Sequence, residues 1–172
     1  LRDPTRFAEV AGRALEAGKP LVALKAGRSE IGAKVTISHT ASLSGSDDLY
    51  QALFERCGVV RVASPTDLLE TLKMLAIAGA PKGRRTMVFT CSGGDAALLA
   101  DYGEQHGLVY DPPSAVVAGR LKPLLPPIAT VANPLDYTTP LWGKEAELGL
   151  MLDAALGDRP DFALMAQDHP RP

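Results

Sequence analysis

The sequence lacks the features that would assign it to a membrane or to a nucleic acid. No apolar run approaches the roughly 20 residues that a membrane-spanning helix needs. The net charge of −2 gives no electrostatic basis for binding nucleic acid or an anionic membrane surface. Only two cysteines are present, Cys57 and Cys91, and they are far apart, which favours free thiols in a reducing cytoplasm.

Common ligand-binding motifs are also missing. Neither GxGxxG nor GxxxxGK followed by Ser or Thr occurs, so neither a dinucleotide fingerprint nor a P-loop is supported. The three histidines, His39, His106 and His169, form no set with the spacing of metal ligands, and we expect no metal site. The chain opens on Leu1 rather than methionine, which is typical of a fragment of a longer polypeptide.

What is present is an alternation of helical and strand patterns along the whole chain. Helices are predicted over 3–18, 47–58, 64–79, 91–107, 112–126 and 143–157. Strands are predicted over 21–26, 59–63, 86–90, 108–110 and 161–168. Asp3 and Ser64 are suited to cap the first and third helices, and Gly18 and Gly58 to end the first two. Such alternation favours an α/β fold with parallel sheets.

A linker divides this pattern near its middle. The stretch "APKGRR" (80–85) combines proline, glycine and charge between two apolar segments. We therefore predict two small, doubly wound, mainly parallel-sheet units, residues 1–80 and 81–172. A single continuous sheet is the alternative architecture.

The stretch between the first strand and the second helix, 25–48, is predicted to be a long loop. Loops of this class usually have about 2–6 residues, and much longer ones tend to be functional or disordered. Its composition is suited to an anion such as phosphate, and equally typical of a solvated surface loop. The groups that suit an anion are Ser42, Ser44, Ser46, Gly45, Lys25, Arg28 and Lys34.

His39 lies inside this stretch, in "KVTISHTASLSGSDDL". A lone histidine is more often structural than catalytic, and no adjacent cysteine or serine elbow indicates a hydrolase triad. An imidazole can still act as a nucleophile and form a covalent intermediate. A phosphorylated histidine would need N–H groups or helix N-termini around its added charge.

Two further loops are candidates for supplying such groups. In "TCSGGDAALLA" (90–100), Gly93 and Gly94 follow a strand and open a helix, which is typical of an anion site and also of a tight turn. In "ATVANPLDYTTPLWG" (129–143), Asn133, Asp136 and Thr138 fit turn-forming and capping roles, or a second phosphate-facing helix N-terminus.

Taken in this order, "SHTASLSGSD", "CSGGD" and "ANPLD" resemble the NDP-forming acyl-CoA synthetases, relatives of succinyl-CoA synthetase. The resemblance covers nearly the whole chain. It implies that residues 1–80 are a phosphohistidine domain, truncated at its N-terminus, and that 81–172 are a second flavodoxin-like ligase domain. Many members have "SHTGAL" where this chain has Ala41 and Ser42, a mild departure.

The resemblance also implies a set of site residues. His39 would take phosphate from an acyl phosphate and pass it to a nucleoside diphosphate. Helix N-termini would meet the charge of the phosphohistidine. The expected phosphate-binding residues are Ser38, Thr40, Ser42, Gly45, Ser46, Gly93, Gly94, Asn133, Asp136 and Thr138.

The implied ligands are a carboxylic acid, CoA and ATP or ADP with Mg²⁺. CoA-binding and ATP-grasp domains, on the same polypeptide or on partner subunits, would bind most of them. Two alternatives belong to other classes of function. One is a non-catalytic module that responds to CoA or acyl-CoA in a larger protein, such as an acetyltransferase fusion. The other is a generic flavodoxin-like binding domain, which flavin absorbance would reveal.

Overall fold

The computed structural model describes residues 1, 3–40 and 46–167, with the backbone alone for residues 36–40. The chain divides into two compact units, Leu1–Ala80 and Pro81–Pro172, here called unit 1 and unit 2. Each unit has its own parallel sheet, of two strands in unit 1 and three in unit 2. The predicted α/β class with two small parallel-sheet units is confirmed. None of the helices in the described residues is long and apolar enough to cross a membrane.

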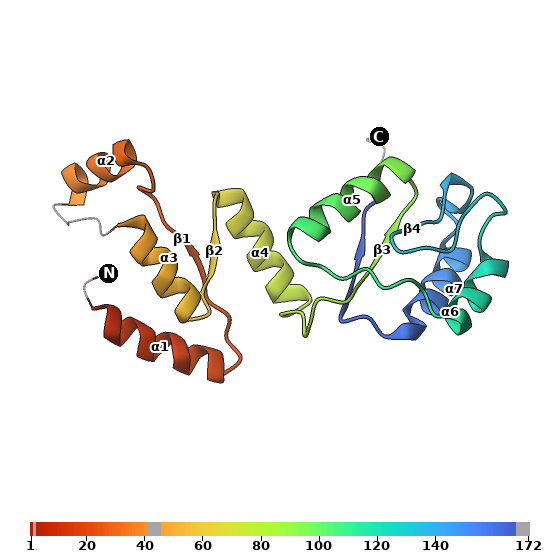
Figure 1. Cartoon of the computed structure of the whole chain (residues 1–172), viewed down its shortest axis with the longest axis horizontal. Helices are drawn as coiled ribbons and strands as arrows, with labels where there is room; N and C mark the ends of the chain where they lie inside the picture. The colour runs from red at the N-terminus through yellow and green to blue at the C-terminus, as the bar shows by residue number, and fades with distance from the viewer. Residues whose placement is uncertain (2, 41–45, 168–172) are drawn as a thin grey trace. The chain divides into compact units, whose positions relative to one another are not determined.

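Unit 1 is built around one pair of strands. Its elements are α1 (Pro4–Glu16), β1 (Val22–Leu24), α2 (Glu30–Thr40), α3 (Asp47–Arg56), β2 (Val60–Val62) and α4 (Pro65–Ile77). The strands are parallel, with Val22 opposite Val60. Helices α1 and α3 cover one side of the pair and α4 covers the other (Figure 1). Ala11, Phe54, Cys57 and Val59 form the buried core between the strands, α1 and α3.

Local signals in the sequence explain where these helices begin and end. Asp3 caps α1, because its side chain accepts a hydrogen bond from the Arg6 N–H at 2.9 Å. Ser64 and Asp67 form a reciprocal capping box at the start of α4. Gly18 and Gly58 follow α1 and α3 with φ angles of 67° and 62°, which glycine adopts without steric cost.

Unit 2 has a sheet with helices on both faces (Figure 1). Its elements are β3 (Thr86–Thr90), α5 (Gly93–Gln105), α6 (Ala115–Leu121), η1 (Lys122–Leu124), β4 (Leu135–Asp136), η2 (Thr139–Leu141), α7 (Glu145–Ala155), η3 (Leu156–Asp158) and β5 (Phe162–Met165). The strand order is β4-β3-β5, and both pairings are parallel. The central strand β3 is buried at all five positions, as expected for a strand covered on both faces.

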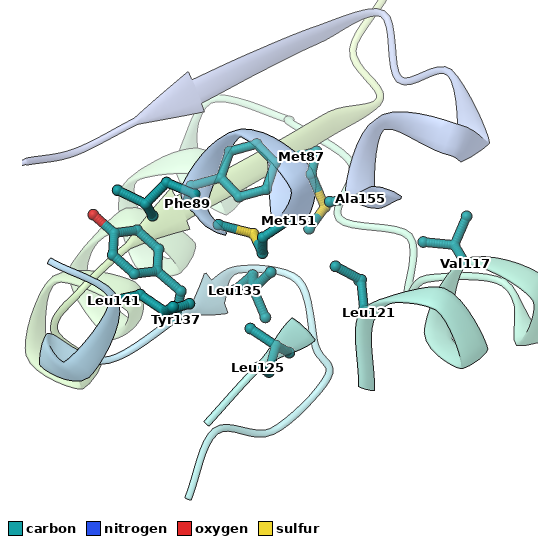
Figure 2. Close-up of a cluster of buried hydrophobic side chains, with 11 residues drawn as sticks. Met87, Phe89, Val117, Leu121, Leu125, Leu135, Tyr137, Leu141, Met151 and Ala155 are labelled. Atoms are coloured by element: carbon teal, nitrogen blue, oxygen red, sulfur yellow. The ribbon is translucent and has the colours of Figure 1, made fainter. Parts of the chain in front are cut away.

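The main core of unit 2 lies between the sheet and helices α6 and α7. Met87 and Phe89 point from β3 into this core, where they meet Leu121 of α6 and Met151 of α7 (Figure 2). The alternation along a strand sends Val88 to the opposite face, which carries α5. The apolar residues of β3 thus pack against helices on both faces of the sheet, and this packing fixes the position of the carboxyl end of β3.

Three sequence predictions of secondary structure were wrong. The predicted loop 25–48 contains the helix α2, because Ser29 caps it by accepting from the Gly32 N–H at 3.1 Å. The predicted strand 108–110 is a single bridge between Arg85 and Val109. Conversely, the predicted loop 129–143 contains β4, whose two residues form a strand because they pair with Phe89 and Thr90 of β3.

Candidate functional site

His39 lies in the last turn of α2 in unit 1, rather than in an extended loop. Ser38 and Thr40 flank it in the same turn, and the structure describes only the backbone of all three. Ser42 and Gly45 are outside the described residues. Ser46 is the exposed N-cap of α3, and its side chain makes no capping hydrogen bond there. The described chain therefore places His39 at the end of one helix and an exposed serine at the start of the next.

The turn that leads into α2 is compact. Gly27 has a φ angle of 73°, and a Cβ on Gly32 would lie 3.2 Å from the Gly27 Cα. A side chain at Gly32 would therefore press this turn apart. This close approach fixes how the His39-bearing helix leaves the end of β1.

The cations predicted to attract an anion have an internal partner. Lys25 and Arg28 both pair with Asp47, the first residue of α3, while Lys34 is exposed on α2. Arg61 of β2, which sequence reasoning missed, pairs with the same carboxylate. The side-chain hydrogen bond from Arg61 is the main reason that the pKa of Asp47 lies below its usual value.

In unit 2 the N-terminus of α5 lies at the carboxyl end of β3, where open α/β sheets bind ligands. Ser92 caps this helix, since its hydroxyl accepts from the Asp95 N–H at 3.3 Å. Gly93 and Gly94, the first two residues of α5, are both exposed. Their main-chain N–H groups belong to the positive end of a 13-residue helix, which is suited to an anion.

Asp136 and Thr138 lie beside this helix end. One carboxylate oxygen of Asp136 accepts from the Thr138 N–H at 2.9 Å, and the other would be 3.4 Å from a Cβ on Gly93. Thr138 has a φ angle of 64°, a strained conformation for a β-branched residue. The structure thus brings together four of the predicted phosphate-binding residues: Gly93, Gly94, Asp136 and Thr138.

Asn133 lies at the other end of the same strands. Its side-chain oxygen accepts from the Val88 N–H at 3.1 Å, and its amide donates to the carbonyls of Thr86 and Asp111 at 2.7 and 3.0 Å. These three bonds engage the whole amide group and hold the start of β4 against β3. Asn133 is therefore a structural neighbour of the site and not part of the cluster around Gly93.

Two residues at this edge were missed by sequence reasoning. Thr90 is fully buried, and its hydroxyl accepts from the Ser92 N–H at 3.2 Å, which supports the turn into α5. Tyr137 is also fully buried, and burial is the main cause that raises its pKa. Among the described residues, the buried hydroxyl of Thr138 has no hydrogen-bond partner. The alternation Leu135, Asp136, Tyr137 is the signal that places Tyr137 inside and Asp136 outside.

Comparison with known proteins shows which family and which enzymes the chain is similar to. Residues 1–75 match the family described as the succinyl-CoA ligase like flavodoxin domain. Over 84% of its length the chain is 37% identical to subunit alpha of the ADP-forming acetate–CoA ligase II of Pyrococcus furiosus, and it covers 31% of that protein. It is 36% identical to subunit alpha of isoenzyme I from the same organism, over 90% of this chain and 33% of that one.

A solved structure agrees with these relatives. The dinucleotide-forming acetyl-coenzyme A synthetase 1 of Ca. Korarchaeum cryptofilum, in complex with phosphate and ADP, matches with a TM-score of 0.82 and 29% identity. The match covers 97% of this chain and 36% of that one. Residues 1–75 therefore match a succinyl-CoA ligase like flavodoxin domain, and most of the chain is similar to a portion of ADP-forming acetate–CoA ligases. The chain spans about a third of the length of the curated relatives it matches.

Proposed function

We propose that this chain is the phosphoryl-carrying portion of an ADP-forming acyl-CoA ligase, with His39 as the carrier. The observation that carries the proposal is the alignment with an ADP-forming acetate–CoA ligase subunit over 84% of the chain. The ordered motifs around His39, Gly93 and Asp136 lie in the same chain. The acyl acid is proposed only as a class, a carboxylic acid.

The chemistry of His39 follows from the nucleophilicity of a neutral imidazole. A ring nitrogen attacks the phosphorus of an acyl phosphate, the phosphorus–oxygen bond to the acyl group breaks, and the carboxylate leaves. A terminal oxygen of a nucleoside diphosphate then attacks the same phosphorus, and the phosphorus–nitrogen bond breaks. The second step returns the imidazole and yields the nucleoside triphosphate.

The N-terminus of α5 is the proposed receiving site in unit 2 for a phosphoryl group. Gly93 and Gly94 are exposed and offer main-chain N–H groups, so an anion can approach without displacing a side chain. Asp136 is an anion itself and would repel phosphate. Its hydrogen bond to Thr138 supports a positioning role at this edge in place of direct phosphate contact.

The remaining ligands are assigned to other parts of the ligase. CoA, ATP or ADP and Mg²⁺ are proposed because the relatives are ADP-forming CoA ligases. The described residues include no group of three or more His, Cys, Asp or Glu side chains that could hold a metal ion. The described residues therefore offer no set of ligands for a resident Mg²⁺, and no step of the proposed mechanism uses one. We propose that the reaction takes place in the cytoplasm, and the free thiols of Cys57 and Cys91 support this location.

The proposal predicts a phosphohistidine that depends on His39. The complete ligase polypeptide would be incubated with Mg²⁺ and ATP labelled at the γ-phosphate, and the bound label tested for stability in acid and in base. We expect an acid-labile, base-stable label, which His39→Ala removes because no other residue of the chain is proposed to carry the phosphoryl group.

The matched control is His106→Ala, at the C-cap of α5, which should leave the label unchanged. A label of full intensity in His39→Ala would contradict the proposed carrier.

A further inference from the structure

Four charged side chains of unit 1 converge where β1 ends and α3 begins; we call them the Asp47 cluster. Arg61 Nη2 lies 2.5 Å from one Asp47 oxygen, and Lys25 Nζ lies 3.4 Å from the same oxygen. Arg28 Nε lies 3.8 Å from the other. The side chains of Arg61 and Lys25 are only 9% and 12% exposed, and that of Asp47 is 27% exposed. Water therefore screens the pairs that Arg61 and Lys25 make with Asp47 less than pairs at an open surface, whereas Arg28, 52% exposed, is more open to water.

Further contacts bind the cluster to α3. Arg61 Nη1 donates to the Gln51 side-chain oxygen at 2.8 Å, one turn beyond Asp47. Lys25 Nζ lies 4.8 Å from the centre of the Tyr50 ring, and it also donates to the carbonyls of Ala26 and Gly27 at 3.4 and 3.3 Å. A cation from β2 and a cation from the end of β1 thus fix the first turn of α3 from two directions.

The position of the cluster in the sequence gives it a consequence for His39. Lys25 and Arg28 lie between β1 and α2, and Asp47 is the first residue of α3. The ion pairs therefore tie the turn from which α2 starts to the first turn of α3. Because α2 carries His39 near its end, these ion pairs restrict how the start of that helix can move.

We infer that the Asp47 cluster is a positioning device, which ties the start of α2 to the start of α3 and so holds the helix that carries His39 in place for phosphoryl transfer. The inference rests on the proposed function. Displacing a reacting group by about 1 Å can cost about 100-fold in rate, so a tether at the start of this helix is kinetically significant.

The cluster is better suited to this role than to binding phosphate itself. Asp47 and the two carbonyls engage the Lys25 ammonium, and Asp47 and Gln51 engage both terminal nitrogens of Arg61. The first turn of α3 also carries two carboxylates, Asp47 and Asp48, which would repel a phosphate. The carboxylate of Asp47 already occupies the position between Lys25 and Arg61 that a bound anion would take.

The test compares Asp47→Asn with wild type in the complete ligase, using the rate of labelling of His39 by γ-labelled ATP. Asparagine keeps the size of the side chain and removes its charge. We expect the labelling rate at saturating ATP to fall by about 10- to 100-fold, with the half-saturating ATP concentration changed by less than about twofold. Glu70→Gln is the matched control, because it removes an exposed carboxylate paired with Lys73 elsewhere in unit 1. It should label at the wild-type rate.

A second variant keeps the inference testable if Asp47→Asn fails to fold. Lys25→Met retains most of the apolar stem, leaves the Arg61–Asp47 pair in place, and should slow labelling by about tenfold. Wild-type rates in a folded Asp47→Asn or Lys25→Met protein would overturn the inference. So would a change confined to the half-saturating concentration, which would indicate phosphate binding. Absence of label on wild-type His39 would instead overturn the proposed function.

Discussion

Asp158 illustrates how a single residue can hold several elements of unit 2 together. Its two carboxylate oxygens accept from the Ser114 N–H and hydroxyl, both at 2.7 Å. Ser114 is in turn the N-cap of α6, so this carboxylate joins η3 to the start of that helix. The backbone hydrogen bond from Ser114 is the first cause that lowers the pKa of Asp158 from its usual 3.8.

The lowered pKa predicts a pH dependence of stability. A carboxyl group whose pKa is lower in the folded state stabilises the protein above its unfolded pKa, and this contribution is lost as the pH falls through the folded pKa. We expect unit 2 to lose stability as the pH falls below about 4, and we expect Asp158→Asn to lose less over that range. Urea unfolding followed by Trp142 fluorescence at several pH values measures this.

The control is Asp153→Asn, on the exposed side of α7, which should keep the wild-type pH profile. An Asp158→Asn protein with an unchanged slope below pH 4 would show that the Ser114 bonds do not stabilise the carboxylate form.

Some individual site residues could be predicted from sequence and others could not. Gly93 and Gly94 follow an apolar strand, and this local pattern predicts a helix N-terminus exposed to ligands. Asn133 belongs to the same short motif as Asp136, yet the parallel pairing with β3 separates them by placing one near Val88 and the other beside Thr90. Only the register of the sheet decides which end of a strand each side chain reaches.

At the scale of secondary structure elements, capping explains most of the agreement between sequence and structure. The sequence "SPTD" predicts the start of α4, and the structure has the capping box there. The start of α2 also has a capping residue, Ser29 in "SEIG", so the same kind of signal was present there. The prediction missed this helix because the many hydroxyl side chains of 36–46 indicated a loop.

The capping box predicts a measurable contribution to the stability of unit 1. Ser64→Ala removes the hydroxyl that accepts from the Asp67 N–H at 3.1 Å, and should lower the free energy of unfolding by about 1 kcal/mol. Thr66→Ala, two residues further on and exposed, is the control and should change it by less than about 0.5 kcal/mol. Far-UV circular dichroism in urea measures both. Equal effects of the two changes would contradict the role of the cap.

At the scale of the whole molecule, each unit has a separate apolar core. Leu121 is fully buried in the core of unit 2, whereas Phe54 is buried in the core of unit 1. Trp142, the only tryptophan, lies in unit 2 and therefore reports on that unit.

The core of unit 2 predicts a large effect of truncation at Leu121. Leu121→Ala leaves a cavity between β3, α6 and α7, and should lower the free energy of unfolding of unit 2 by about 2–5 kcal/mol. Leu98→Ala, on an exposed position of α5, is the control and should cost less than about 1 kcal/mol. Urea unfolding followed by Trp142 fluorescence measures both, and an unmoved Leu121→Ala transition would contradict the packing in Figure 2.

The sequence by itself determined the α/β class and the ends of most helices, which follow from local causes, namely periodicity and capping residues. The role of His39 as the expected carrier is implied only by the resemblance of three ordered motifs to a known family. Only the tertiary structure decided that Lys25, Arg28 and Arg61 share the carboxylate of Asp47, and that Asp136 lies beside Gly93 while Asn133 does not. The physical reason is that ion pairs and strand register bring together residues that are far apart in the chain. No local sequence pattern shows which distant residues will meet.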